Sequence, residues 1–479
     1  MMRQVSTCAR ALLAAVLLAM AAVTLGTAQT RDGATQESAA TQDDAASQRR
    51  LGEALVFGLG DVGQDVASGR RLLEAAAAAG DARAKASLGK ILLEGYYLPA
   101  EPDRALTLLQ DAAAAGVVQA QITLGLALLW GGPVEADPER ARVLLGQAAQ
   151  AGDTQALRIL GEQLVGGWVF DRDAAEGSAM LEAAVAKGDP EAQVALGSFL
   201  LYGTGLPPDL ARALELFESA AAAGNAEGLE LYGEWLMWSQ TRPAAAETFL
   251  RRAGDMGRGS AWVVLAEGAM YGYLPPRSRA KFDGYAEKAR AAGQERIAVL
   301  EAERRMWGIS MRASGPKTVA LLEKAAENGN ATALKYLIGL VRDGNHVNIR
   351  KRPVHARDYL ARFGALLTPL EIAQFSTTIE AAKANDIGAY ARVAEELERQ
   401  PELISAWFAK ELYRANPNVA VYLLQADMRR RGLYGGPLNG LATRSTLRAL
   451  WRACMTLDDS VPCRDGVMHP DVIGALLAR

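Results

Sequence analysis

The chain has 479 residues, half of them hydrophobic, and its 52 Lys and Arg nearly balance its 55 Asp and Glu, so that the net charge is −3. This balance excludes the strongly basic surface on which nucleic-acid binding depends. Three His and three Cys leave few groups for a metal centre or a nucleophile, and we expect neither a metal ion nor a cofactor. The chain is also longer than one hydrophobic core usually serves, which favours a repeat array.

The N-terminus has the pattern of a secretory signal peptide. Arg3 and Arg10 precede an apolar run at residues 11–25, and Gly26 and Ala28 offer the small side chains of a cleavage site. We expect cleavage after Ala28, export to the periplasm and no stable membrane span afterwards. The alternative is a retained anchor, although the run is shorter than the ~20 residues that a span requires.

A repeat of 36 residues organises the next part of the chain. Glycines recur at this spacing in three series, which are Gly80, Gly116, Gly152, Gly188 and Gly224; Gly89, Gly125, Gly161, Gly197 and Gly233; and Gly95, Gly131, Gly167 and Gly203. After one step that is three residues shorter, the register continues from Gly257 to Gly344. A fixed period between about 20 and 50 residues is typical of a solenoid.

Each period predicts two helices. Ala105, Leu109 and Ala112 share one helical face, and Gly116 ends that helix where a positive φ is needed. In the next helix, Gly125 would let a neighbouring helix approach closely. Three aspartates recur at the same spacing, each just before a predicted helix, and they are Asp137, Asp173 and Asp209. Glu101 stands at the matching place in an earlier repeat. Carboxylates at this place are suited to be N-caps.

This pattern resembles the Sel1-like repeat family, which is related to the tetratricopeptide repeat. The residues that carry the resemblance in one repeat are Ala105, Leu108, Leu109, Ala112, Ala113, Gly116, Ala120, Leu124, Gly125 and Gly131. Leu often stands where the family has Trp or Tyr. The resemblance implies an all-α fold, a right-handed superhelix of α/α hairpins that binds other proteins.

Large aromatic residues recur at one position of the repeat, just before the third-series glycine or its substitute. They are Trp130, Tyr202, Trp238, Tyr271 and Trp307. One interpretation is that they fill gaps between hairpins. The other is a partner surface, a line of aromatic side chains suited to a peptide or a sugar chain.

The C-terminal residues resemble the peptidoglycan-binding-like domain family, a three-helix module. The matching residues are Leu424, Gln425, Met428, Gly432, Gly436, Asn439, Gly440, Thr446, Ala449 and Leu450. The departures from the family pattern are Asn439 for Asp, Thr443 for Gly, and Ala453 and Cys454 for Phe and Gln. The resemblance implies contact with a glycan or the cell wall, which we expect at Tyr434, Asn439, Thr446 and Arg430.

Cys454 and Cys463 are the cysteines that remain after the signal peptide is removed. In an exported protein an even number of cysteines favours a disulfide between them. The alternative is a zinc site that adds His469, but the spacing fits no common zinc pattern and a fourth ligand is lacking.

The sequence therefore predicts five segments: a signal peptide at 1–28, a disordered leader at 29–45, a Sel1-like solenoid at 46–364, a degenerate helical cap or connector at 365–415, and a peptidoglycan-binding-like domain at 416–479. No nucleotide-binding, hydrolase or zinc-protease motif occurs, so we expect no enzyme.

The favoured function is an exported protein–protein interaction scaffold of the cell envelope, tethered to peptidoglycan. The alternatives are a component of exopolysaccharide (alginate-like) assembly or export and a periplasmic regulator of a sensor kinase. The expected partners are envelope proteins and peptidoglycan or another polysaccharide.

Overall fold

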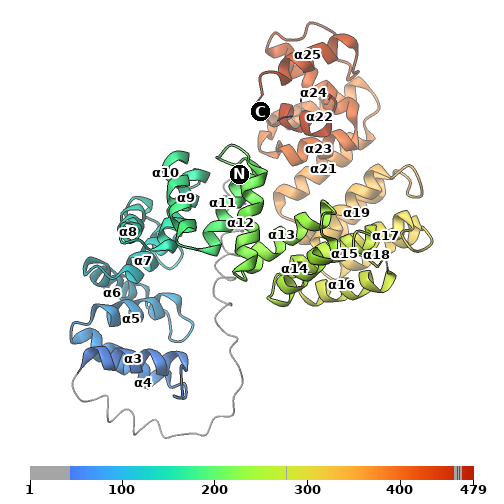
Figure 1. Cartoon of the computed structure of the whole chain (residues 1–479). Helices are drawn as coiled ribbons and strands as arrows, with labels where there is room; N and C mark the ends of the chain where they lie inside the picture. The colour runs from blue at the N-terminus through green and yellow to red at the C-terminus, as the bar shows by residue number, and fades with distance from the viewer. Residues whose placement is uncertain (1–43, 277, 458–460, 462, 464–465) are drawn as a thin grey trace. The chain divides into compact units, whose positions relative to one another are not determined.

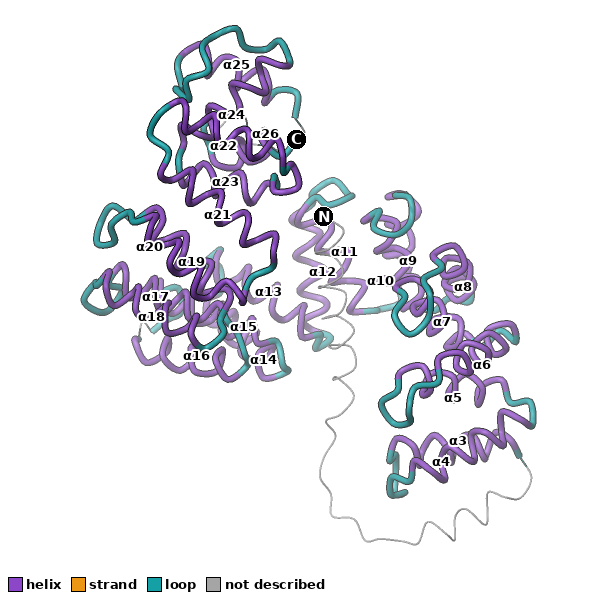
Figure 2. The backbone as a smooth tube through the Cα atoms, turned by 180° about the vertical axis from the view of Figure 1, so that it is seen from behind, coloured by secondary structure: helices purple, strands orange, loops and turns teal. Residues whose placement is uncertain are grey.

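The structure is a computed structural model that describes residues 44–276, 278–457, 461, 463 and 466–479. The predicted signal peptide and nearly all of the predicted leader lie outside these residues. Throughout the described part the regular elements are helices, without a strand, as Figure 2 shows. The expected all-α fold is therefore confirmed. The chain divides into two compact units between Ser219 and Ala220.

The first unit is a stack of helix pairs (Figure 1). Its helices are α3 (Ala45–Phe57), α4 (Val66–Ala78), α5 (Ala82–Glu94), α6 (Pro102–Ala114), α7 (Val118–Trp130), α8 (Pro138–Gln150), α9 (Thr154–Gly166), α10 (Ala174–Ala186) and α11 (Pro190–Tyr202), while α12 (Leu210–Ala222) crosses the division. An odd-numbered helix, here called the first helix, packs against the even-numbered second helix that follows it. First helices also contact one another, α3 with α5, α5 with α7 and α9 with α11.

The second unit begins with four pairs of the same kind. They are α13 (Ala226–Trp238) with α14 (Pro243–Asp255), α15 (Gly259–Tyr271) with α16 (Arg279–Ala291), α17 (Arg296–Trp307) with α18 (Gly315–Glu327), and α19 (Ala331–Asp343) with α20 (Pro353–Phe363). Here too the first helices α13, α15, α17 and α19 contact one another in order. The repeat pattern fades from the sequence after Gly344, but α20 still packs against α19 as a second helix does.

Carboxylates cap the second helices, as their spacing predicts. The Asp137 side chain accepts a hydrogen bond from the backbone N–H of Arg140 at 3.1 Å, and Asp209 accepts one from Arg212 at 3.0 Å. Such a cap satisfies an N–H that has no partner inside the helix. Glu101 differs, because its carboxylate forms no cap hydrogen bond and instead contacts arginines, including Arg70 at 2.8 Å.

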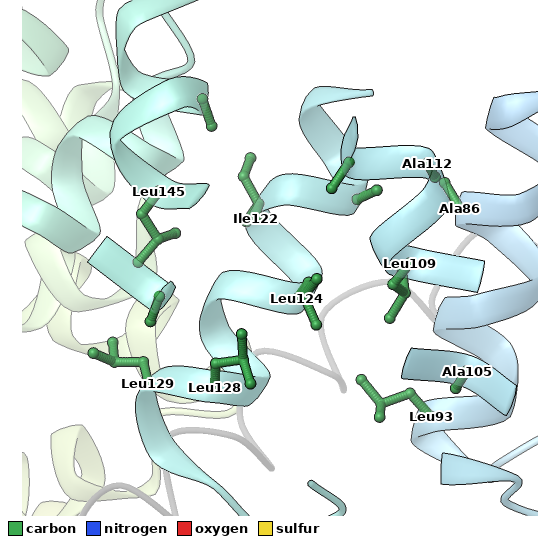
Figure 3. Close-up of a cluster of buried hydrophobic side chains, with 14 of the residues drawn as sticks. Ala86, Leu93, Ala105, Leu109, Ala112, Ile122, Leu124, Leu128, Leu129 and Leu145 are labelled. Carbon is green, nitrogen blue, oxygen red and sulfur yellow. The ribbon is translucent and has the colours of Figure 1, made fainter. Parts of the chain in front are cut away.

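Glycines in the first helices from α3 to α13 allow their pairs to close tightly. A Cβ atom added at Gly161 would lie 2.7 Å from Cγ of Leu181 on the second helix, which is too close for a real side chain. The same relation joins Gly89 to Leu109 and Gly197 to Phe217. Leu109, and Leu145 in the next pair, belong to a continuous buried cluster, part of which Figure 3 shows around Leu109, Leu124 and Leu145. Glycine is therefore required here by close approach.

The second unit continues into non-repeating helices, which are α21 (Pro369–Lys383), α22 (Ile387–Arg399), α23 (Ala406–Ala415), α24 (Pro417–Arg430), α25 (Arg444–Cys454) and α26 (Pro470–Leu477), with 3₁₀ turns at Gly364–Leu366 and Pro401–Leu403. Thr368 and Glu371 form a capping box at the start of α21. Arg342 on α19 is fully buried and reaches Glu411 on α23 at 2.9 Å. This buried ion pair joins the last repeat pair to the helices that follow.

Candidate interaction surface

The recurring aromatic residues lie at the C-terminal ends of first helices, and all five are exposed. The exposed fractions are 37% for Trp130, 69% for Tyr202, 39% for Trp238, 46% for Tyr271 and 51% for Trp307. Of the two interpretations from the sequence, buried gap filling does not describe these side chains. Large exposed apolar side chains at a repeated position indicate, within each unit, a surface on which a ligand can be held.

In the second unit each aromatic residue follows a glutamate by four residues. Glu234 precedes Trp238, Glu267 precedes Tyr271 and Glu303 precedes Trp307, on the first helices α13, α15 and α17. A spacing of four places the two side chains on the same helical face. We call these six residues the acidic–aromatic ladder. The aromatic residues were predicted from the sequence, whereas the glutamates were not, although their shared repeat position could have revealed them.

Contacts within the ladder hold the aromatic rings in place. The Trp238 indole N–H donates a hydrogen bond to Oε1 of Glu234 at 3.2 Å. Tyr273, in the loop after α15, packs its ring edge-on against Trp238 with the centroids 5.2 Å apart, and it also lies near the Tyr271 ring. The aromatic surface is thus partly ordered before any ligand arrives, which lowers the entropy lost on binding.

The carboxyl groups of Glu234 and Glu303 are half-buried, and burial changes their acidity. Burial raises the pKa of Glu234, the carboxylates of Glu230 and Glu267 raise it further, and the Trp238 hydrogen bond opposes the rise. Burial likewise raises the pKa of Glu303, against a hydrogen bond from the Tyr336 hydroxyl. Ionised carboxylates are therefore held in surroundings that solvate them poorly.

Cations near the ladder neutralise only part of this charge. Arg296 lies 3.5 Å from Glu267, and Arg258 lies 2.6 Å from Glu230. Within the described residues, neither Glu234 nor Glu303 has a Lys or Arg at ion-pair distance. These two carboxylates bind only neutral donors, an indole N–H and a phenol.

The first helices of the first unit present a different face. Several of their charged residues pair within a helix, Arg158 with Glu162 at 2.9 Å and Lys90 with Glu94 at 3.9 Å. At the repeat position of the ladder glutamates stand Glu53, Lys90, Leu126, Glu162 and Ser198, and both of these glutamates pair with an arginine of their own helix. The acidic–aromatic ladder is therefore a property of the second unit.

The structure corrects the predicted wall-contact residues of the C-terminal module. Tyr434 is 5% exposed and Thr446 is fully buried, so neither can offer a face to a glycan. Asn439 is half-buried, with its side-chain oxygen bound by Nε2 of Gln425 at 3.2 Å. Arg430 is exposed but pairs with Glu398 at 2.8 Å.

The reason for this burial is the fully buried amide of Gln425 on α24. Its Oε1 accepts hydrogen bonds from the backbone N–H groups of Asn439 at 3.0 Å and Gly440 at 2.9 Å, and its Nε2 donates to Thr446 at 3.1 Å. A buried amide needs such partners, and they tie the turn before α25 to α24. The polar residues that match the family pattern therefore hold the module together, and this role of Gln425 was not predicted from the sequence.

Cys454 and Cys463 are joined in a disulfide, with their Cα atoms 5.9 Å apart. Nδ1 of His469 instead accepts a hydrogen bond from the backbone N–H of Asp471 at the start of α26. Across the described residues, no group of three or more His, Cys, Asp and Glu is arranged to hold a metal ion. None of the described helices has the length and apolar character needed to cross a membrane.

Five segments match a family model described as Sel1 repeat, namely residues 45–81, 82–117, 118–153, 190–225 and 297–330. Each covers one helix pair of the structure, so the chain contains Sel1 repeats, as the resemblance implied. The pairs α9/α10, α13/α14 and α15/α16 lie outside the matched segments but have helices of the same length, 13 residues. The match does not extend to residues 416–479.

Several solved structures are similar to the chain. A Sel1 repeat protein from Oxalobacter formigenes is 25% identical over 67% of this chain and 99% of its own, with a TM-score of 0.46. A protective antigen of uropathogenic Escherichia coli with an SLR fold is 19% identical over 85% of this chain and 90% of its own, with a TM-score of 0.47. A putative sel1 repeat protein from Klebsiella pneumoniae is 23% identical over 41% and 94%, with a TM-score of 0.29. The comparison with curated proteins found no match.

Proposed function

We propose that this Sel1-repeat chain is an exported scaffold of the cell envelope that holds a partner protein on the exposed face of its first helices. Sel1-repeat proteins are protein-interaction scaffolds, and the repeats are present here. The single observation that carries the proposal is the exposure of the five recurring aromatic residues. Trp and Tyr are the residues that most often dominate the binding energy of protein interfaces.

The proposed location is the periplasm. It rests on the signal-peptide pattern at residues 1–28 and on the chemistry of Cys454 and Cys463, because disulfides persist in oxidising compartments. Fractionation of cells that express the full chain would test it. Recovery of the mature chain with the periplasmic proteins is the expected result, and recovery with the cytosol would refute it.

For residues 416–479 we propose a capping role in place of a tether. The predicted wall-contact residues Tyr434 and Thr446 are buried, and α26 packs against α23 with Val472 and Ile473 fully buried. The helices α21 and α23 cover the last repeat pair, and residues 416–479 cover α23 in turn, as the terminal elements of a repeat array do. Incubation of the full chain with purified sacculi tests this, since capping predicts no co-sedimentation at moderate salt, whereas retention would restore the wall-binding hypothesis.

A second candidate function, in exopolysaccharide assembly, is favoured by the same exposed aromatic residues, which can stack on sugar rings. An alginate-like chain is anionic, however, and the ladder of the second unit carries an excess of carboxylates. A glycan would therefore suit Trp130 and Tyr202 of the first unit better. Replacing these two by Ala should abolish retention on an immobilised polyuronate if this function is correct, and leave it unchanged if the partner is a protein.

Site-specific photo-crosslinking in living cells tests the scaffold proposal. A photoreactive residue at Tyr271 or Trp307 should give discrete crosslinked products with a partner protein. The control is the same residue at Glu287, an exposed position on the second helix α16. Products that are equally strong at Glu287, or absent at every position, would contradict the proposal. Identification of a sensor kinase among the products would favour the regulator hypothesis.

A further inference from the structure

We propose that the acidic–aromatic ladder of α13, α15 and α17 binds an extended protein segment rich in Arg and Lys. In this arrangement the charged group of each Arg or Lys side chain contacts a ladder carboxylate. The aliphatic part of that side chain, or the guanidinium plane, lies on the aromatic ring one helical turn away. The inference names the partner class for the proposed scaffold function and therefore rests on it.

The geometry of the repeat supports an extended segment. The three glutamates stand at one repeat position and the three aromatic residues at another, on first helices that contact one another in order. Each repeat thus offers the same pair of groups, one carboxylate and one ring. A partner that repeats a cationic side chain along an extended backbone can occupy these pairs in succession.

Charge complementarity determines whether the partner segment is cationic or anionic. Glu234, Glu267 and Glu303 supply three carboxylates, and Arg296 supplies one opposing cation beside Glu267. Carboxylates that burial has already deprived of solvent gain more from a cation than fully solvated ones, because the local dielectric is lower. An anionic partner would be repelled, and an apolar one would leave Glu234 and Glu303 without a cation.

Aromatic rings beside carboxylates add selectivity for cations. A guanidinium can bind a carboxylate with its N–H groups while its plane stacks on a ring. The chain already contains contacts of this kind, since Nζ of Lys288 lies 4.0 Å from the Trp262 ring centroid and the Arg304 guanidinium lies 4.2 Å from the Phe282 ring. The ladder offers comparable rings that are exposed. The first unit lacks the matching row of carboxylates, which confines the proposed segment to the second unit.

Fluorescence anisotropy with the purified full chain tests the proposal. The probes are two labelled synthetic peptides, one alternating Arg and Ser and the other alternating Glu and Ser. We expect the Arg peptide to bind at least tenfold more tightly than the Glu peptide and more weakly as salt increases. Equal affinity for the two peptides would overturn the proposal.

Two sets of variants separate the ladder from general charge. The triple variant Glu234→Gln, Glu267→Gln, Glu303→Gln should weaken binding of the Arg peptide at least tenfold. A matched triple variant, Glu139→Gln, Glu287→Gln, Glu402→Gln, removes the same charge at exposed positions outside the ladder and should retain binding within about twofold. Equal losses in both variants would show attraction by net charge alone and would refute the ladder as the site.

The aromatic contribution has its own control. Tyr271→Ala should weaken binding several-fold, while Tyr271→Phe, which keeps the ring, should bind as the parent does. Circular dichroism confirms that each variant is folded. If the Arg peptide fails to bind although photo-crosslinks form at Tyr271 and Trp307, the scaffold function stands and the basic partner is wrong. If both fail, the scaffold function itself is wrong.

Discussion

Leu145 of α8 packs directly against the backbone of Gly125 in α7, so closely that a Cβ atom at Gly125 would lie 2.8 Å from the Leu145 Cγ. The same contact recurs in the neighbouring pairs, at Gly89 and Gly161. In the pairs that carry this glycine, from α3/α4 to α13/α14, tight closure therefore depends on the absence of a side chain at one position of the repeat.

Replacing Gly125 by Leu should destabilise the chain by overpacking, by about 1–3 kcal/mol. Urea denaturation followed by circular dichroism measures this. Gly146 on α8 is the matched control, because nothing lies within 4 Å of the Cβ that Gly146→Ala would add. That substitution should stabilise by about 0.5–1 kcal/mol, since Gly is unfavourable in a helix. A neutral Gly125→Leu would show that the pairs do not close as described.

Replacing Gln425 by Leu should destabilise the C-terminal module. The change removes the partners of the backbone N–H groups of Asn439 and Gly440, and an unsatisfied buried group costs about 1–3 kcal/mol. Limited proteolysis should reveal faster cleavage near residues 438–442. The control is Leu441→Ser, at an exposed side chain in the same turn, which should leave the cleavage rate nearly unchanged.

Replacing Glu234 by Gln should raise the melting temperature at pH 7. Burial raises the pKa of this carboxyl in the folded chain above its unfolded value, so the folded state binds the proton more tightly. The contribution of Glu234 to the free energy of unfolding is then highest below the pKa that it has in the unfolded chain. This contribution falls as the pH rises through the pKa that it has in the folded chain. The neighbouring charges are Glu230, Glu267 and Arg296.

The advantage of Glu234→Gln should therefore shrink as the pH is lowered to about 4, where the carboxyl is largely protonated in both states. The Gln side chain retains an oxygen that can accept the Trp238 hydrogen bond, so this hydrogen bond is kept in both the parent and the variant. Glu287→Gln, on an exposed face, should change the melting temperature little at either pH. An advantage of Glu234→Gln that is the same at pH 4 and pH 7 would show that charge is not its cause.

Cys454 and Cys463 should be oxidised in protein purified from the periplasm. Thiol blocking without reductant, followed by intact-mass measurement, should detect no alkylated cysteine in the mature chain. The bond closes a loop of ten residues, whose contribution is about 2.5–3 kcal/mol on the chain-entropy model. Cys454→Ser with Cys463→Ser should accordingly lower the stability of the module. Two alkylated thiols in the parent would contradict the disulfide.

The sequence alone determined the features that depend on local chemistry. The period of 36 residues, the two helices of each repeat and the caps at Asp137 and Asp209 follow from residues a few positions apart. The capping box at Thr368 is equally local. These elements form because glycine, proline and short polar side chains begin and end helices wherever they occur.

Only the tertiary structure decided which side chains face the solvent. Tyr434 was predicted to contact a glycan yet is buried beside the Gln425 amide, whereas Trp307 could have filled a gap between hairpins yet is exposed. The ladder arises because Glu234, Glu267 and Glu303, 33 and 36 residues apart, are brought onto neighbouring first helices. Burial and electrostatic surroundings depend on neighbours in space, and the packing of one repeat on the next supplies those neighbours.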